Sequence, residues 1–322
     1  MNIVKLDYNR GNTVTRANRL FFIFCTLYFL SRLIITMYMS IQINMYGIDV
    51  ANNQIEDLRY PVILFNELVL VLLPCVIYTI IYRLNIPYGF RFNSLQFKNV
   101  LMVLFLCIPL YVFLSSLNSL SFYFLQRIGE IPANDIPVPQ NAGEYVFSLF
   151  IVAFVPAVCE EYFMRGILLN AYNRRGAFGA IMISGIFFTI FHFDVTNLFA
   201  PFFFGIIIGY VVLKTNSIYA GVLAHFLNNA IAQTMQYFLY NPNSSATIHI
   251  LLEDLPTILL QCLVSLAIIL SLLMAIKAMN PESKLKKPIR NPFLGALDIV
   301  THWPIFLSLS LYGAMIYLKF GV

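Results

Sequence analysis

The chain has 322 residues, of which 60% are hydrophobic and only 11% are charged, and its formal net charge is +5. Soluble domains carry about 25% charged residues, so this composition excludes an ordinary soluble enzyme, a disordered chain and a nucleic-acid-binding protein. So much apolar surface cannot be buried inside one globule of this size, and we expect lipid to surround the chain. The composition therefore predicts an all-α, polytopic membrane helix bundle in the cell membrane.

Apolar runs along the chain set the expected number of membrane spans. The first run, Leu20–Leu30, follows several basic residues and continues to about Met45 without a small-residue cleavage site, which predicts a retained signal-anchor helix. A spanning helix needs about 20 predominantly apolar residues, and by this criterion we expect eight or nine spans. The candidates are residues 20–43, 61–82, 99–125, 144–172, 176–193, 198–213, 217–240, 255–277 and 302–319.

The polar intervals between these spans predict the orientation of the chain in the membrane. Basic and acidic intervals alternate, and short loops rich in Lys and Arg favour the cytosolic side. We therefore expect a multi-pass protein whose N-terminus is cytosolic and whose C-terminus is external. The basic intervals are the N-terminal segment and residues 83–98, 174–175, 214 and 277–290, and the acidic ones are residues 49–57, 130–135, 194 and 253–254.

Two further patterns concern the later part of the chain. Gly205 and Gly209 form a GxxxG pattern on the sixth expected span, which allows close helix contact within the chain or between two copies. Met279–Val300 is the one expected linker, because it contains several prolines and a basic cluster. The cluster could bind anionic lipid headgroups, although a basic cytosolic loop needs no such role. Its members are Lys284, Lys286, Lys287 and Arg290.

Three ionisable residues interrupt the fourth expected span, namely Glu160, Glu161 and Arg165. At roughly 3 kcal/mol each, they would cost on the order of 9 kcal/mol if they faced lipid, so we expect them to face the bundle interior or a wet cavity. Glu161 and Arg165 are spaced i, i+4 and can form an ion pair, whereas Glu160 lies about 100° away around the helix. Glu160 is therefore a candidate general base. The alternative is a packing salt bridge beside a glutamate that reaches the interface.

Two histidines and an asparagine follow on later spans. His192 ends the fifth expected span, and its distance from the turn near Arg174–Gly176 places it at a similar depth to Glu160. His225 and Asn229 share one face of the seventh span, where both can donate hydrogen bonds to one oxygen atom. Each can instead serve packing, because a lone histidine is often a satisfied core residue and polar residues in spans form interhelical hydrogen bonds.

The other polar residues give weaker signals. Five cysteines are scattered singly through apolar runs, so we expect neither a disulfide framework nor a thiolate zinc site. The sequence contains no HExxH and no GxSxG motif. Glu67 and Arg32 lie inside expected spans, but each is near enough to an end for its charge to reach the interface.

Three motifs on the central spans resemble those of the CPBP family of intramembrane proteases, which includes CAAX prenyl endopeptidases and bacteriocin-processing Abi proteins. They are EExxxR at Glu160–Arg165, FxxxH at Phe188–His192 and HxxxN at His225–Asn229, and they lie in this order within Tyr145–Tyr237. The resemblance divides the chain into three parts. These are unmatched N-terminal spans at residues 1–143, a catalytic core at residues 144–240, and C-terminal helices with a basic linker at residues 241–322.

The resemblance implies a hydrolase, an intramembrane endopeptidase whose substrate is a membrane-associated peptide or protein, with or without an attached lipid. It assigns three pairs of residues to the reaction: Glu160 with His192 activates water, His225 with Asn229 binds the oxyanion, and Glu161 with Arg165 has a structural or orienting role. This mechanism requires no cofactor. The alternative is a metalloprotease with Zn²⁺ held by Glu160, His192 and His225, which together make a His₂Glu ligand set.

Other classes of protein also fit parts of the pattern. A secondary transporter would use the buried Glu and His residues as a proton relay, but transporters usually show repeat symmetry and discontinuous helices, and the sequence shows neither. A non-catalytic immunity or scaffold protein of the same fold could retain the motifs. A CAAX prenyl protease proper would require a prenylated substrate, and no residue of the chain reveals that selectivity.

Overall fold

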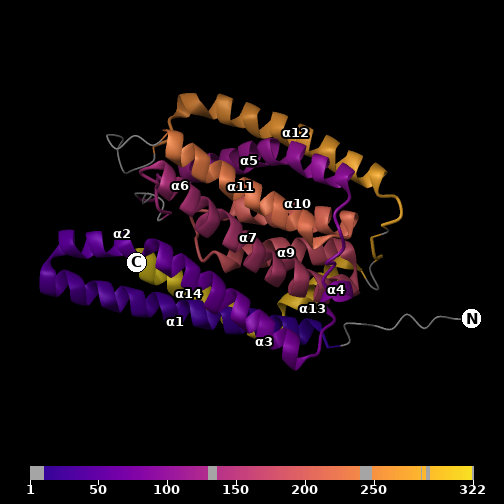
Figure 1. Cartoon of the computed structure of the whole chain (residues 1–322), viewed down its shortest axis with the longest axis horizontal. Coiled ribbons are helices and arrows are strands. Elements are labelled where there is room, and N and C mark those ends of the chain that lie inside the picture. Colours follow the sequence, from indigo (N-terminus) through magenta and orange to yellow (C-terminus); the bar gives the residue numbers. More distant parts are fainter. Residues whose placement is uncertain (1–10, 130–135, 240–248, 284, 288–290, 321–322) are drawn as a thin grey trace, which may run out of the picture.

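The computed structural model describes residues 11–129, 136–239, 249–283, 285–287 and 291–320, and the regular elements in these ranges are all helical. Most of the helices run side by side along the longest axis of the molecule (Figure 1). The expected all-α class is therefore confirmed. The acidic interval at residues 130–135, the basic residues Lys284 and Arg290, and the C-terminal Val322 lie outside the described residues.

The N-terminal region forms a long antiparallel hairpin (Figure 1). Its first arm is α1 (Val14–Tyr46), and the chain reverses at Gly47, whose φ of +86° suits a residue without Cβ. The helix resumes at once, so the acidic interval at residues 49–57 is helical and lies between the candidate spans Val14–Tyr46 and Asp57–Ile81. The second arm consists of α2 (Ile48–Phe65), the π-helical η1 (Asn66–Leu72) and α3 (Leu73–Ile81).

The central segment of the chain is helical without a break from Ala142 to Arg175. A π turn holds more residues than an α turn, so it rotates the side chains that follow, and such turns are frequent at functional sites. The segment ends at Gly176, where φ is +129°, and this confirms the expected turn. It consists of α6 (Ala142–Ser148), π-helical η2 (Leu149–Phe154), α7 (Val155–Glu161), π-helical η3 (Tyr162–Leu168), α8 (Leu169–Tyr172) and the 3₁₀ turn η4 (Asn173–Arg175).

The remaining helices surround this segment. Figure 1 shows α5 and α12 along one side of the molecule, α1 and α2 along the opposite side, and α7, α9, α10 and α11 between them. α11 packs against η2 and α7, and α1 packs against α14. The bounds are α4 (Ile86–Gly89), α5 (Phe97–Leu125), α9 (Ala177–Phe191), α10 (Phe199–Thr215), α11 (Ile218–Leu239), η5 (Leu252–Asp254), α12 (Leu255–Met279), α13 (Pro292–Val300) and α14 (Trp303–Phe320).

The glycines of the GxxxG pattern pack inside the chain. A Cβ atom on Gly205 would lie only 2.7 Å from Cα of Gly185 on α9, so these two glycines let α9 and α10 approach closely. Gly209 faces Ile181 of α9 at ordinary van der Waals distance. The pattern thus serves an intramolecular helix contact.

Five helical segments of the described chain are long and apolar enough to cross a membrane, or six if α13 and α14, which meet at 65°, count as one bent span. α9 has 15 residues and α10 has 17, which makes them about 23 and 26 Å long, shorter than the ~30 Å hydrocarbon core. α11 has 22 residues but polar side chains interrupt it. The structure shows a multi-pass helical protein, whereas eight or nine spans are not shown.

The expected linker Met279–Val300 carries the helix α13 in its second half. Proline is well suited to the first position of a helix, and α13 begins at Pro292. Asp298 of α13 pairs with Arg175 at 2.5 Å, and the backbone N–H of Ala177 donates to the carbonyl of Lys286 at 3.0 Å. This segment therefore packs against the start of α9.

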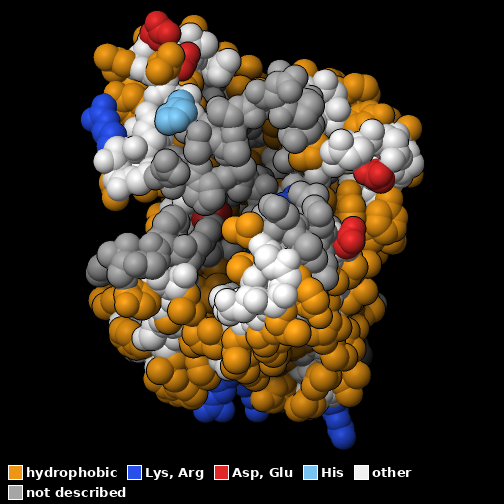
Figure 2. Space-filling model, turned by 90° about the vertical axis from the view of Figure 1, so that its left-hand side faces the viewer, with side chains coloured by type: hydrophobic (Ala, Val, Ile, Leu, Met, Phe, Trp, Pro, Cys, Tyr) orange, Lys and Arg blue, Asp and Glu red, His pale blue; other side chains and the backbone are white. Residues whose placement is uncertain are grey.

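Hydrophobic side chains cover much of the outside of the molecule. Figure 2 shows them over most of the described surface seen from one end, with Lys and Arg confined to a few places. Large apolar residues such as Phe97, Ile108 and Leu263 are exposed, whereas Arg165 is among the largest fully buried side chains. This distribution suits a lipid exterior around a polar interior site.

Candidate active site

The ionisable cluster of the fourth expected span is buried. Glu160 is 6% exposed, and Glu161 and Arg165 are both 0% exposed. The two glutamates end α7, and Arg165 lies in the π turn η3 that follows. The expectation that these residues face the interior of the bundle is confirmed.

Glu161 is the centre of a buried hydrogen-bonded network. Its Oε1 accepts hydrogen bonds from Nη1 of Arg165 at 2.7 Å and from Nδ1 of His225 at 3.0 Å. The i, i+4 ion pair expected from the sequence is therefore present. Because an ionised carboxylate can only accept, Nδ1 of His225 carries the hydrogen, and this bond fixes the orientation of the imidazole ring.

Gly221 makes this network possible. It lies one turn before His225 on α11, and a Cβ atom there would come within 2.6 Å of Oε2 of Glu161. A larger residue would push α11 away from α7 and lengthen the bond between His225 and Glu161. The sequence analysis missed this glycine, whose only signal is its position four residues before a buried histidine.

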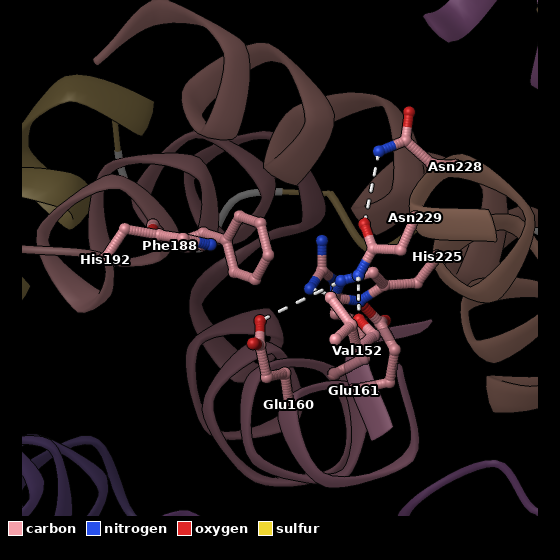
Figure 3. Close-up of polar contacts among 9 residues, drawn as sticks. Val152, Glu160, Glu161, Phe188, His192, His225, Asn228 and Asn229 are labelled. Carbon is pink, nitrogen blue, oxygen red and sulfur yellow. Dashed lines mark hydrogen bonds and ion pairs between the residues drawn. The ribbon is translucent and has the colours of Figure 1, made fainter. Parts of the chain in front are cut away.

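Glu160 lies on the other side of the His225 ring. Its Oε2 is 4.0 Å from Nε2 of His225, which is longer than a direct hydrogen bond. Figure 3 shows the two side chains pointing toward each other from α7 and α11. His225 thus stands between two carboxyl groups, one that binds it and one that faces it.

Glu67 is buried in a helix that packs against α7. It is 8% exposed, and the π turn η1 that carries it contacts α7, which carries Glu160. The helix begins at Ile48 and the candidate span covers Asp57–Ile81, so Glu67 lies further from the start of its span than the expected range 61–82 indicates. Glu67 therefore lies well inside the span, where an ionisable residue is a functional-site signal by default.

His192 lies at the C-terminal end of α9, and a phenyl ring stands between it and His225. Its Nδ1 donates to the carbonyl oxygen of Phe188 at 2.7 Å, which leaves Nε2 as an acceptor. The Phe188 ring centroid is 4.7 Å from the His192 ring and 5.8 Å from the His225 ring (Figure 3). The described residues show no hydrogen bond or ion pair between His192 and Glu160, so their cooperation stays a prediction.

Asn229 lies close to His225 on α11 (Figure 3). Its Nδ2 donates to the carbonyl oxygen of Val152 at 3.4 Å, and Nδ2 of Asn228 donates to Oδ1 of Asn229 at the same distance. Both bonds lie at the long end of the hydrogen-bonding range. An amide donor that is held this weakly can turn to a better acceptor at little cost.

Aromatic rings enclose the inner side of the site. The guanidinium of Arg165 lies 4.8 Å from the ring centroid of Phe188 and 5.8 Å from that of Phe204, and the Phe204 ring is 5.0 Å from His225. Rings of this kind stabilise the cation and exclude water. The lower local dielectric strengthens each electrostatic interaction in the site.

The alternative zinc site is not assembled by the described residues. Among them, no group of three or more His, Cys, Asp or Glu side chains is arranged to hold a metal ion. Glu160 and His225 face each other, but His192 lies beyond Phe188. The expected His₂Glu donors therefore do not fit a shared metal ion in this arrangement.

The segment that carries these residues matches a known protein family. Residues 142–231 match the family described as Type II CAAX prenyl endopeptidase Rce1-like. The chain contains an Rce1-like domain of the CPBP type. No curated protein and no solved structure matches the chain. The matched residues include every expected site residue from Glu160 to Asn229, whereas Glu67 lies outside them. The resemblance seen in the sequence is confirmed, and the domain implies a protease that acts on peptide or protein substrates.

Proposed function

We propose that the chain is an intramembrane endopeptidase that hydrolyses a peptide bond in or near the membrane. The observation that carries this proposal is the buried carboxyl of Glu160, which faces a histidine held by the Glu161–Arg165 ion pair within the Rce1-like domain. Amide hydrolysis needs a base that activates water and donors that stabilise the developing oxyanion. Glu160 is the candidate base, and His225 and Asn229 are the candidate donors.

In this mechanism Glu160 is the general base. It takes a proton from a water molecule while the oxygen of that water attacks the scissile carbonyl carbon, and it then gives the proton to the leaving amine. His192 assists through Nε2, because its Nδ1 is occupied by the carbonyl oxygen of Phe188. The role of His192 is secondary to that of Glu160 in this scheme.

His225 and Asn229 bind the oxyanion. The carboxylate of Glu161 stabilises a protonated imidazole, as the acidic member of a catalytic triad does, so that Nε2 of His225 can donate. Nδ2 of Asn229 supplies the second donor once it leaves the carbonyl oxygen of Val152. Glu161 and Arg165 position His225 and do not themselves touch the substrate.

The proposed substrate is a membrane-associated peptide or protein, with lipidated proteins included in this class. An apolar exterior brings the protein into the same phase as such substrates. The family description names CAAX prenyl endopeptidases, so C-terminal peptides that carry a prenylated cysteine are the first substrates to assay.

We propose further that the N-terminus and the basic segment before α13 are cytosolic and that the C-terminus is external, in a cell-membrane protein with nine spans. Alternation of basic and acidic intervals supports this orientation, and α9 and α10 would cross as short helices. Single cysteines introduced at positions 286 and 322 should label from opposite sides of the membrane. Labelling of both from one side would contradict the nine-span arrangement.

The most direct test compares protein termini in the membranes of cells that carry the wild-type chain or the Glu160→Ala variant. New termini that appear only with the wild-type chain identify substrates, and the protein purified in detergent should cleave peptides with those sequences. Identical sets of termini in the two strains would overturn the proposal. That result would favour a non-catalytic scaffold protein with the same fold.

A further inference from the structure

The helix end that carries His192 has a backbone conformation that its sequence does not favour. His192 is the C-cap of α9, and the next residue, Phe193, has a φ of +48°. Helices commonly end with glycine in this left-handed conformation, because a residue with a Cβ atom is strained there. A bulky residue keeps such a conformation only where the surrounding structure holds it. Phe193 is 5% exposed, so the interior of the bundle must supply that support.

Aromatic rings of α1 hold this helix end. The ring of Tyr28 stacks on that of Phe193, with centroids 4.9 Å apart and planes at 20°. One turn earlier on α1, the ring of Phe24 stacks on that of Phe191 at 4.3 Å and 14°. Contacts of this kind therefore lie on both sides of His192 in the chain. We call these four residues the α1–α9 aromatic cluster: Phe24, Tyr28, Phe191 and Phe193.

Arg32 supports the Tyr28 ring. Its Nε and Nη2 donate hydrogen bonds to Oη of Tyr28 at 3.1 and 2.8 Å, and its guanidinium lies 5.2 Å from the ring centroid. A cation over an aromatic ring stabilises that arrangement. Tyr28 is thus fixed from one side by Arg32, one turn later on the same helix, and from the other by its contact with Phe193.

The orientation of the His192 ring depends on the last turn of α9. Nδ1 of His192 donates to the carbonyl oxygen of Phe188 at 2.7 Å, and the backbone N–H of His192 donates to the carbonyl oxygen of Thr189 at 3.3 Å. Both bonds need the helical path of the chain up to His192. The first of them leaves Nε2 as the acceptor that the proposed mechanism uses. Movement of the helix end would therefore turn the imidazole away from its place in the site.

We propose that the α1–α9 aromatic cluster positions the imidazole of His192 for the reaction. This inference rests on the proposed function, because it takes His192 as a participant in peptide cleavage. α1 lies outside the matched residues 142–231. The N-terminal hairpin then completes the active site in addition to anchoring the chain in the membrane.

A double-mutant cycle between Tyr28 and His192 tests this role. Tyr28→Leu keeps an apolar side chain but removes the stacked ring, so kcat on a peptide substrate should fall by roughly 10- to 100-fold, the order expected when a reacting group is misplaced by about 1 Å. KM should change little. In a His192→Ala background the same substitution should cause no further fall in kcat, because the imidazole that it misplaces is absent. A general loss of folded protein would lower the rate in both backgrounds.

Two further variants of α1 are the controls. Tyr28→Phe keeps the stacked ring and should retain most of the wild-type kcat. Phe22→Leu removes a different aromatic contact of α1, the one with Trp303 at a centroid distance of 5.9 Å, and should leave kcat unchanged. The proposal would be overturned if Phe22→Leu or Tyr28→Phe lowered kcat as much as Tyr28→Leu does, or if the effects of Tyr28→Leu and His192→Ala were additive.

An NMR measurement tests the orientation of the imidazole without any substrate. In protein labelled with ¹⁵N-histidine, the signal that disappears in His192→Ala should be that of a ring with its hydrogen on Nδ1. Tyr28→Leu should shift this signal or divide it between two tautomers, whereas Phe22→Leu should leave it in place. An unchanged His192 signal in a folded Tyr28→Leu variant would overturn the proposal.

The same experiments separate this inference from the proposed function. If the wild-type protein cleaves no peptide, or if Glu160→Gln retains turnover, the proposed endopeptidase activity fails, and the NMR signal alone decides whether α1 sets the orientation of the His192 ring. If cleavage depends on Glu160 but His192→Ala keeps a wild-type kcat, the proposed activity stands and only the positioning role fails.

Discussion

The two carboxyl groups on either side of the His225 ring, those of Glu161 and Glu160, differ in their hydrogen-bond partners. On one side, Glu161 accepts hydrogen bonds from Arg165 at 2.7 Å and from His225 at 3.0 Å. On the other side, Oε2 of Glu160 lies 4.0 Å from Nε2 of His225 and has no hydrogen-bond partner among the described residues. The two glutamates are adjacent in sequence and both are buried, so burial alone does not separate their roles. The cation-bound group is suited to structure, and the group without a bound cation is suited to proton transfer.

Replacement of Glu160, the proposed general base, should have the largest effect on peptide cleavage. Glu160→Gln is nearly isosteric but cannot take a proton from water, so peptide cleavage should be abolished. No ion pair at hydrogen-bonding distance is lost, and the thermal unfolding midpoint in detergent should stay close to the wild-type value. Cleavage assays and unfolding scans on the same preparation measure both quantities. Retained turnover would contradict the assignment of Glu160 as the base.

The corresponding substitution of Glu161, the glutamate that is bound to Arg165 and His225, should mainly lower the stability of the protein. Glu161→Gln leaves Arg165 buried without its ionised partner, and breaking a buried ion pair in this way costs about 3–5 kcal/mol. The free energy of unfolding in detergent should fall by that order, with a lower yield of folded protein. If Glu161→Gln were as stable as Glu160→Gln, the two sides of His225 would not differ as described here.

Part of this comparison could be predicted from the sequence. The i, i+4 spacing fixed Glu161 and Arg165 on one helix face, and the structure joins them at 2.7 Å. Ion-pair partners within one helix depend only on local periodicity, which explains this success. The order of the three motifs also identified the segment that the family match confirms.

The rest of the site depends on packing between helices, which spacing does not determine. Gly221 sets the approach of α11 to Glu161, and nothing in its neighbours reveals that contact. The three π turns rotate the side chains that follow them, so a straight-helix calculation of depth does not fix which histidine meets Glu160. Glu67 lies further inside its span than the expected range 61–82 indicates, because the candidate span begins at Asp57 and the helix at Ile48.

A smaller effect on turnover is expected when the amide donor of Asn229 is removed. If Asn229 binds the oxyanion, its hydrogen bond strengthens only as charge develops on the carbonyl oxygen, and removing such a donor typically lowers kcat by about 10²–10³. Asn229→Ala should therefore lower kcat strongly while KM stays nearly constant. Steady-state kinetics on one peptide substrate measure both parameters.

Asn228→Ala provides the control for that measurement. Asn228 is adjacent to Asn229 but lies about 100° around the helix, and its Nδ2 reaches only Oδ1 of Asn229, at 3.4 Å. We expect this variant to retain most of its activity. Equal impairment of the two variants, or a wild-type kcat for Asn229→Ala, would assign the pair to helix packing.

The smallest effect should come from metal removal, and it tests whether Glu160 acts as a base or as a ligand. A catalytic zinc ion would take Glu160, His192 and His225 as its ligands, yet the Phe188 ring lies between the two histidines. On the mechanism proposed here, exhaustive dialysis against a chelator leaves peptide cleavage intact, and metal analysis finds well under one zinc ion per chain. Loss of activity that only added Zn²⁺ restores would move these three residues to ligand roles. Glu160 would then no longer be the unbound carboxyl that distinguishes the two sides of His225.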